Sequence, residues 1–194
     1  MSSTHGTQTP SESGLWRPGW WLGFLWGFAE GTLFFIIPDV LLSWASLTGA
    51  KCGFKILGAI LAGSLVAGLC MYSWAASQPE QSRSVVASVP FVRAKMFDKV
   101  QEDYRDQGIS GMLKGPGSGI PYKVYAVLAP PVTNPAVFAL VSIPARLERL
   151  ALSWLVFTLL GWFFQRWIRN HSRIVTMLFL AFWIFTYASY WSRI

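Results

Sequence analysis

Two carboxylates interrupt an apolar stretch near the start of the chain. Glu30 and Asp39 are the only charged residues in the stretch 20–47, and Pro38 immediately precedes the aspartate. A carboxylate at membrane depth is energetically costly and is usually paired or functional. Proline lacks a backbone donor and disfavours helix in the residue before it. The stretch is long enough to cross a bilayer, but this pattern predicts a broken or re-entrant hairpin over about residues 20–50.

The composition of the whole chain agrees with a membrane protein. Hydrophobic residues make up 53% of the 194 residues and charged residues only 13%, and the mean hydropathy is +0.41. The abundant Trp and Phe fit interfacial belts and lipid-facing surfaces. A chain of this length can hold one compact membrane domain but no separate soluble enzyme domain. We therefore predict an all-α integral membrane protein.

The first fifteen residues differ from the rest of the chain. Residues 1–15 are polar and rich in Ser and Thr, and they lack the basic start and apolar centre of a cleavable signal. We expect a disordered tail over residues 1–15 and a single membrane domain over residues 16–194.

Three later segments contain uncharged apolar runs approaching the ~20 residues that a spanning helix needs: 55–76, 148–165 and 174–191. In the first of them, Ala59, Gly63 and Ala67 recur every four residues and so share one face of a helix. Small residues on one face allow a second helix to approach closely. This pattern favours a packing face, and a lipid-facing helix with incidental small residues is the alternative.

The segment 78–115 changes to mixed charge. Within it, Val92, Met96, Val100 and Tyr104 fall at four-residue steps, a pattern typical of an amphipathic helix. Such a helix is expected to lie along the membrane surface. A solvated helix is the alternative, and the sequence does not separate the two.

A second irregular apolar region covers about residues 116–142. It contains Lys123 and is interrupted by several prolines, so a straight helix through its centre is not expected. The prolines that we expect to break the helices in the two hairpins are Pro38, Pro121, Pro130 and Pro131. Paired, discontinuous segments with embedded charges are the best sequence indication of a transporter's midplane site. The region therefore predicts a second re-entrant hairpin.

Arg146 and Arg149 follow this region and are three residues apart, so they share a face if the segment is helical. One interpretation is a basic ring at the membrane interface. The other is that both side chains point inward, toward a phosphate or toward Glu30 and Asp39, because a guanidinium fork fits either partner.

The net charge of +7 does not indicate nucleic acid. Basic residues such as Arg166, Arg169 and Arg173 lie at the ends of apolar segments, where they suit anionic headgroups and the positive-inside rule. A basic face with stacking aromatic residues outside the membrane is absent from the sequence. We therefore expect no nucleic-acid partner.

Enzyme chemistry is not indicated either. Neither His5 nor His171 has a Ser, Cys or acidic partner at catalytic spacing. Cys52 and Cys70 are isolated and lack metal-ligand spacing. We expect no enzyme activity, no metal and no cofactor.

Four short sequence motifs occur in the same order as in a known protein family. The runs FAEGTLFFIIPDVLL, GAILAGSLVAGLCMY, GIPYKVYAVLA and FALVSIPARLERL resemble the DedA family, also called the VTT or SNARE-associated Golgi protein superfamily, over about residues 20–165. The chain is most similar to the small bacterial branch that carries a Gly-Ile-Pro-Tyr-Lys string. The resemblance implies two opposed re-entrant helical hairpins, related as inverted repeats, packed with about three to four transmembrane helices and an amphipathic interfacial helix.

The resemblance also implies a function and a location. Members of the family move lipids between leaflets: bacterial members are linked to proton-coupled flipping of undecaprenyl phosphate or phosphatidylethanolamine, and eukaryotic relatives are similar to phospholipid scramblases. The implied location is the bacterial inner membrane. The implied partners are a membrane phospholipid or lipid phosphate together with protons, and a homo-oligomer is left open.

Individual residues match the family's motifs. Glu30 matches the acid of the first hairpin, and Asp39 stands where many members have a Glu in a Pro-Gly-Glu string. Lys123 falls near the essential arginine of the second hairpin, and Arg146 or Arg149 matches a later basic position. The usual Gly-Arg-Phe-Pro string is replaced here by Pro-Tyr-Lys, so the substrate of the better-known branch does not transfer with the resemblance.

These residues predict a mechanism. Lys123 and the arginines would attract a lipid phosphate while the acyl tails stay in the bilayer. Glu30 and Asp39 would balance the positive charges, and an acid titrating near neutral pH would couple lipid movement to protons. Three alternatives stay open: buried ion pairs that merely fix the hairpins, a non-transporting scaffold or assembly factor, and a proton-coupled small-solute transporter.

Overall fold

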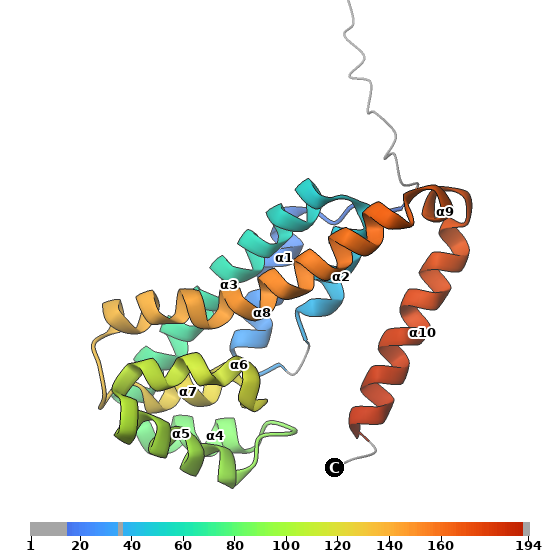
Figure 1. Cartoon of the computed structure of the whole chain (residues 1–194). Helices are drawn as coiled ribbons and strands as arrows, with labels where there is room; N and C mark the ends of the chain where they lie inside the picture. The colour runs from blue at the N-terminus through green and yellow to red at the C-terminus, as the bar shows by residue number, and fades with distance from the viewer. Residues whose placement is uncertain (1–14, 35–36, 192–194) are drawn as a thin grey trace, which may run out of the picture.

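A computed structural model describes residues 15–34 and 37–191, and these residues form helices without any β-strand (Figure 1). The predicted all-α class is therefore confirmed for the described part of the chain. Most of the predicted polar tail, including His5, lies outside the described residues. Its last residue, Leu15, is buried against Ile168 and Val175.

The helices follow one another with short connections. Their bounds are α1 Trp20–Gly31, α2 Asp39–Thr48, α3 Ala50–Ser77, α4 Pro79–Ala87, α5 Ala94–Gln107, the 3₁₀ helix η1 Gly108–Lys114, α6 Gly115–Ser118, α7 Tyr122–Leu128, α8 Pro135–Phe163, α9 Gln165–Asn170 and α10 Ser172–Trp191. Helix α3 packs against α1 on one side and against α2, α7 and α8 on others.

The contact between α1 and α3 is built on glycine. A Cβ added to Gly27 would lie 2.2 Å from the carbonyl oxygen of Ile60, and one added to Gly63 would lie 2.1 Å from that of Phe24. Both distances are far below van der Waals contact, so the two backbones touch directly. The small-residue face predicted on α3 is therefore a packing face within one chain.

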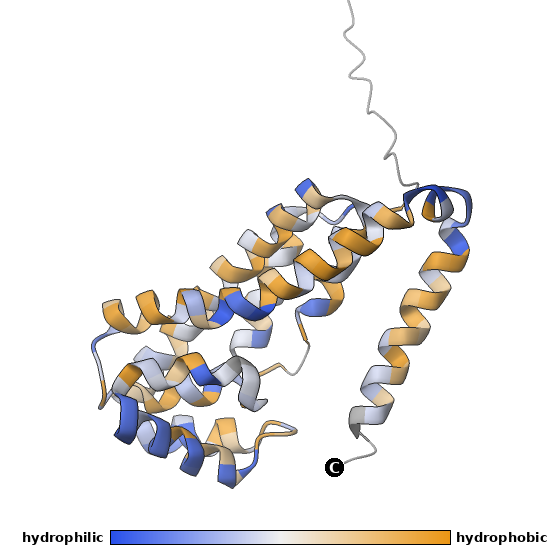
Figure 2. Ribbon diagram, in the orientation of Figure 1, coloured by the Kyte–Doolittle hydropathy of each residue, from blue (hydrophilic) through white to orange (hydrophobic). Residues whose placement is uncertain are grey.

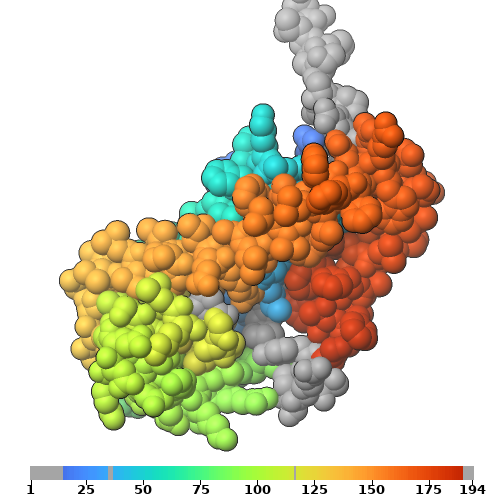
Figure 3. Space-filling model, viewed as in Figure 1, coloured from blue at the N-terminus to red at the C-terminus, as the bar shows by residue number. Residues whose placement is uncertain are grey.

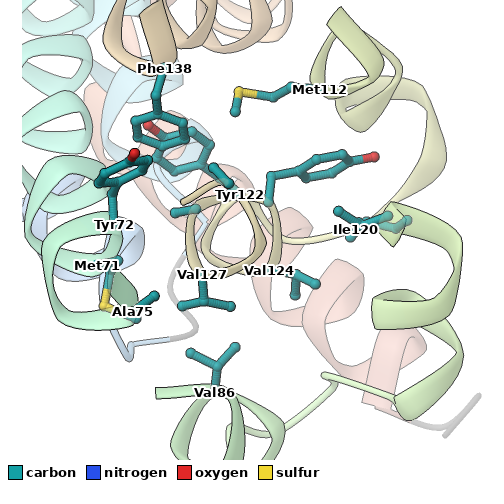
Figure 4. Packing of buried hydrophobic residues seen from close by; sticks show 14 of the residues in the cluster. Met71, Tyr72, Ala75, Val86, Met112, Ile120, Tyr122, Val124, Val127 and Phe138 are labelled. Carbon is teal, nitrogen blue, oxygen red and sulfur yellow. The ribbon is translucent and has the colours of Figure 1, made fainter. Parts of the chain in front are cut away.

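The main hydrophobic core lies between α3, α5, α7 and the start of α8. The rings of Tyr72, Tyr122 and Phe138 gather at its centre, and Val86 of α4 packs below Val127 of α7 (Figure 4). A smaller core joins α2 to α3 and to Leu150 of α8. Helix α7 is thus enclosed on several sides although it is only seven residues long.

Helix α5 has the predicted amphipathic pattern, but its apolar face is already covered. Phe97, Val100 and Tyr104 are buried against the main core, whereas Lys95 and Glu102 are exposed. Burial raises the pKa of the Tyr104 hydroxyl, which donates a 2.9 Å hydrogen bond to the carbonyl of Tyr125 in α7. The apolar face of this helix therefore fastens it to α7.

The segment predicted as a separate span over residues 148–165 is the second half of a longer helix. Helix α8 runs continuously for 29 residues and includes Pro144. Asn134 caps its start by accepting a 3.0 Å hydrogen bond from the backbone N–H of Val137. Pro144 is exposed, and because proline has no backbone N–H, α8 lacks one of its internal hydrogen bonds there. Packing against α2 and α3 supports α8, so this loss does not end the helix.

Two helices of the described chain are long and apolar enough to cross a membrane, judged by length and composition: Ala50–Ser77 and Ser172–Ser189. The first is partly buried by its neighbours. Helix α10 stands at one end of the molecule and is mostly hydrophobic along its length, whereas α5 and α9 are hydrophilic (Figures 1 and 2). Its large apolar side chains, among them Met177, Ile184 and Phe185, are exposed.

Candidate functional site

The candidate site lies where four elements meet: the end of α1, the start of α2, the start of α7 and the middle of α8. Glu30 stands in the last turn of α1 and Asp39 is the first residue of α2. Lys123 is the second residue of α7. All the site residues predicted from the sequence, Arg146 and Arg149 included, are brought to this place.

The two arginines form two separate ion pairs. The guanidinium of Arg146 binds both carboxylate oxygens of Glu30, with Nη1 at 3.3 Å from Oε1 and Nη2 on Oε2. Both side chains are largely buried, with 11% and 13% exposed. Arg149 donates from Nε to Oδ2 of Asp39 at 3.1 Å, and its Nη2 binds the same oxygen. Between the two interpretations of the arginines, this geometry favours inward pointing.

Ser153 and Tyr122 complete these pairs. The hydroxyl of Ser153 donates to Oδ1 of Asp39, and the guanidinium carbon of Arg146 lies 5.0 Å from the centre of the Tyr122 ring. Neither residue is among the site residues predicted from the sequence. Ser153 follows Arg149 by four residues, so helical spacing places it on the same face, and Tyr122 belongs to the Pro-Tyr-Lys string.

Lys123 differs from the arginines because it forms no ion pair with an acid in the described part of the chain. Its side chain is almost fully buried, and Nζ donates a 2.8 Å hydrogen bond to the carbonyl oxygen of Phe34, between α1 and α2. Among the described residues no carboxylate lies within ion-pair distance of this ammonium group. The start of α7 is thus tied to the connection between α1 and α2 by a charge-assisted hydrogen bond.

A cavity of about 230 Å³ opens between these elements. All the charged residues described above except Asp39 contribute to its wall, together with Gly115 of α6 and residues of the connections before α2 and α7. The Nε–H of Arg146 is buried and has no hydrogen-bond acceptor among the described residues. Lys123 and Arg146 both line the cavity, and Lys123 has only one hydrogen-bond acceptor, the carbonyl oxygen of Phe34, among the described residues.

The prolines expected to break the helices lie at the ends of elements. Pro38 immediately precedes α2 and Pro121 immediately precedes α7. Pro130 and Pro131 lie in the turn between α7 and α8. Pro38 and Pro121 also line the cavity. Helix α2, which begins with Asp39, and helix α7, which contains Lys123, therefore both begin at the cavity wall.

The balance of charged groups determines which ligands the site can bind. Two carboxylates, Glu30 and Asp39, face three cations, and both carboxylates are already paired with arginine. The third cation, Lys123, leaves one positive charge over when all five groups are ionised. Within the described ranges no group of His, Cys, Asp and Glu side chains is arranged to hold a metal ion. The cavity is suited to an anion that accepts hydrogen bonds.

Comparison with known proteins gives this chain no relative: no family model, no curated protein sequence and no solved structure matches it.

Proposed function

We propose that the chain is a membrane lipid transporter, a flippase or scramblase that accepts the phosphate of a phospholipid or polyprenyl phosphate in the cavity beside Lys123. The observation that carries the proposal is the buried ammonium of Lys123, which faces a cavity and lacks a carboxylate partner among the described residues. A phosphate oxygen in the cavity would supply a negative charge and a further hydrogen-bond acceptor for the Lys123 ammonium.

Helix lengths support a re-entrant arrangement of the site. Helices α1 and α2 have 12 and 10 residues, and α7 has seven. At 1.5 Å per residue these helices are about 18, 15 and 10 Å long, well short of a hydrocarbon core of about 30 Å. If α3 and α10 span the bilayer, the shorter helices would enter it and turn back, which would set the cavity at depth, as in transporters with discontinuous helices.

The outer surface supports membrane embedding. Large apolar side chains are exposed along α8 and α10, including Leu152, Leu155, Trp162, Phe182 and Phe185. Soluble monomers rarely expose contiguous apolar areas of this extent. We place the chain in a membrane for this reason, and the DedA resemblance, which is part of the same proposal, points to the bacterial inner membrane.

A non-transporting scaffold is the second candidate, and a specific observation favours it. The pairs Glu30–Arg146 and Asp39–Arg149 are complete in themselves and join α1 and α2 to α8, which is what a purely structural role would require. Lys123 separates the two candidates, because no carboxylate among the described residues lies within ion-pair distance of its ammonium group.

Reconstitution in liposomes tests the proposal. The purified chain is placed in vesicles with a fluorescent-headgroup phospholipid in both leaflets, and an impermeant reductant bleaches the outer leaflet. We expect bleaching beyond the outer half with the natural chain. Lys123→Met, which keeps an unbranched side chain but removes the ammonium group, is expected to slow the additional phase by about tenfold or more, as for loss of a charge-assisted contact.

Lys95→Met is the matched control, because it removes the same charge from an exposed position on α5. Bleaching that stops at the outer half with the natural chain would reject scrambling of that lipid. An additional phase of equal rate in the natural chain and in folded Lys123→Met would reject a transport role for the lysine, whereas the absence of this phase in the natural chain would leave the scaffold.

A further inference from the structure

The segment 108–120, which consists of η1, α6 and the residues that follow, forms one wall of the cavity. Met112, Gly115, Gly119 and Ile120 all line it. In Figure 3 this yellow-green segment lies below the orange α8, and Figure 4 shows Met112 and Ile120 on the side of the main core that lies away from Met71 and Tyr72. Any movement of this wall would change access to Lys123.

Both ends of the segment contain a glycine in the left-handed half of backbone space. Gly108 has φ of 58° and Gly119 has φ of 71°. A Cβ at either position would meet no atom within 4 Å, so backbone conformation and not lack of space accounts for glycine there. Glycines of this kind readily absorb changes of backbone angle, as hinges do.

The part of the segment next to Gly108 is a seven-residue 3₁₀ helix, η1. Runs of 3₁₀ helix longer than three or four residues are uncommon because their hydrogen-bond geometry is poor, and they often mark hinges. The wall is therefore a 3₁₀ helix between two permissive glycines, and Met112, which is buried in the main core, is the side chain that a movement of the wall would have to withdraw.

One ion pair fastens this wall to the neighbouring helix. Oδ1 of the buried Asp103 in α5 lies 3.5 Å from Lys114 Nζ at the end of η1. The same oxygen lies 3.5 Å from Lys99 Nζ, which belongs to α5 itself. The second carboxylate oxygen of Asp103 accepts a 3.5 Å hydrogen bond from the hydroxyl of Tyr125, a further cavity residue.

We infer that the segment 108–120 is a gate on the cavity, hinged at Gly108 and Gly119 and held closed by the ion pair between Lys114 and Asp103. Opening separates Lys114 from Asp103 and exposes the cavity wall that faces α8. The gate is a property of the fold and does not depend on which solute or lipid enters the cavity.

Accessibility of a buried cysteine tests the gate. Ala145 of α8 lines the cavity and is buried, and Ala145→Cys is a small change. In a chain whose natural cysteines are replaced by Ser (Cys52→Ser, Cys70→Ser), the labelling rate of this cysteine by a charged, water-soluble methanethiosulfonate reports opening. Lys114→Gln is expected to raise the rate about three- to fivefold, as for loss of a partly exposed ion pair.

Lys99→Gln is the matched control, because it removes an ion pair of the same length to the same oxygen without releasing η1. It should leave the labelling rate unchanged, and Asp103→Asn should raise the rate as Lys114→Gln does. Equal rates for Lys114→Gln and the parent, or equal increases for Lys114→Gln and Lys99→Gln, would overturn the gate. Because the readout is labelling, this result stands apart from the success or failure of the lipid assay.

Discussion

At the scale of single residues, the site depends on charges that are only partly matched. Glu30 and Arg146 form a largely buried ion pair through Nη1 and Nη2, and Asp39 binds Arg149 and Ser153. Lys123 has only a carbonyl oxygen as its partner among the described residues. The paired residues therefore hold the elements together, whereas Lys123 is free to bind a further anion.

We expect Glu30→Gln to lower the free energy of unfolding by about 3 kcal/mol, because it leaves the buried guanidinium of Arg146 without a counter-charge. Exchanging the two residues, Glu30→Arg with Arg146→Glu, should recover part of the loss. Thermal unfolding in one detergent measures both. Glu102→Gln is the control, since it removes an exposed ion pair to Lys99 and should leave stability close to that of the natural chain. A Glu30→Gln variant as stable as this control would contradict the structural role of the pair.

At the scale of helices, the packing of α1 on α3 depends on glycine at some positions but not at others. Gly63 has no room for a methyl group, whereas a Cβ at Gly58 on the same helix meets no atom within 4 Å. Gly63→Ala is expected to destabilise the chain by about 1–3 kcal/mol, because the backbones of α1 and α3 must separate. Gly58→Ala should be neutral or stabilising, since alanine is the better helix former.

Thermal unfolding of these two alanine variants under identical conditions gives the comparison. Opposite signs of the stability change are expected, and equal effects would mean that α1 and α3 do not approach as closely as described.

The sequence predicted the presence of helices better than it predicted where each helix begins and ends. Burial cost alone indicated that Glu30 and Asp39 need partners, and helical spacing placed Arg146 and Arg149 on one face. The pairing itself, and the carbonyl partner of Lys123, depend on how α1, α7 and α8 meet, which no local pattern encodes. The sequence predicts a separate span over residues 148–165, yet tertiary packing on α2 and α3 supports one continuous helix from Pro135 through Pro144 to Phe163.

At the scale of the whole molecule, hydrophilic and apolar surfaces are separated. Exposed apolar side chains concentrate on α8 and α10, whereas the charged outer face of α5 lies at another side (Figure 2). Helix α10 meets the rest of the chain at few places: the ring of Phe179 lies 5.0 Å from that of Trp44, and the hydroxyl of Tyr187 accepts a 3.0 Å hydrogen bond from the N–H of Ile37. In water so little burial would leave α10 poorly held, so we expect lipid to cover most of its surface.

Spin labels on these two surfaces test this expectation. In vesicles, a label at Phe185→Cys on α10 should relax strongly with oxygen, which concentrates in hydrocarbon, and weakly with a water-soluble nickel chelate. A label at Glu102→Cys on α5 should show the opposite preference, because that side chain faces away from the core and carries its charge in an ion pair at the surface. The chain used for both lacks its natural cysteines. Strong relaxation by nickel at both positions would show that α10 lies in water, and the membrane assignment and the lipid function built on it would then be wrong. A preference for oxygen at position 185 alone would show that α10 lies in the bilayer and α5 outside it.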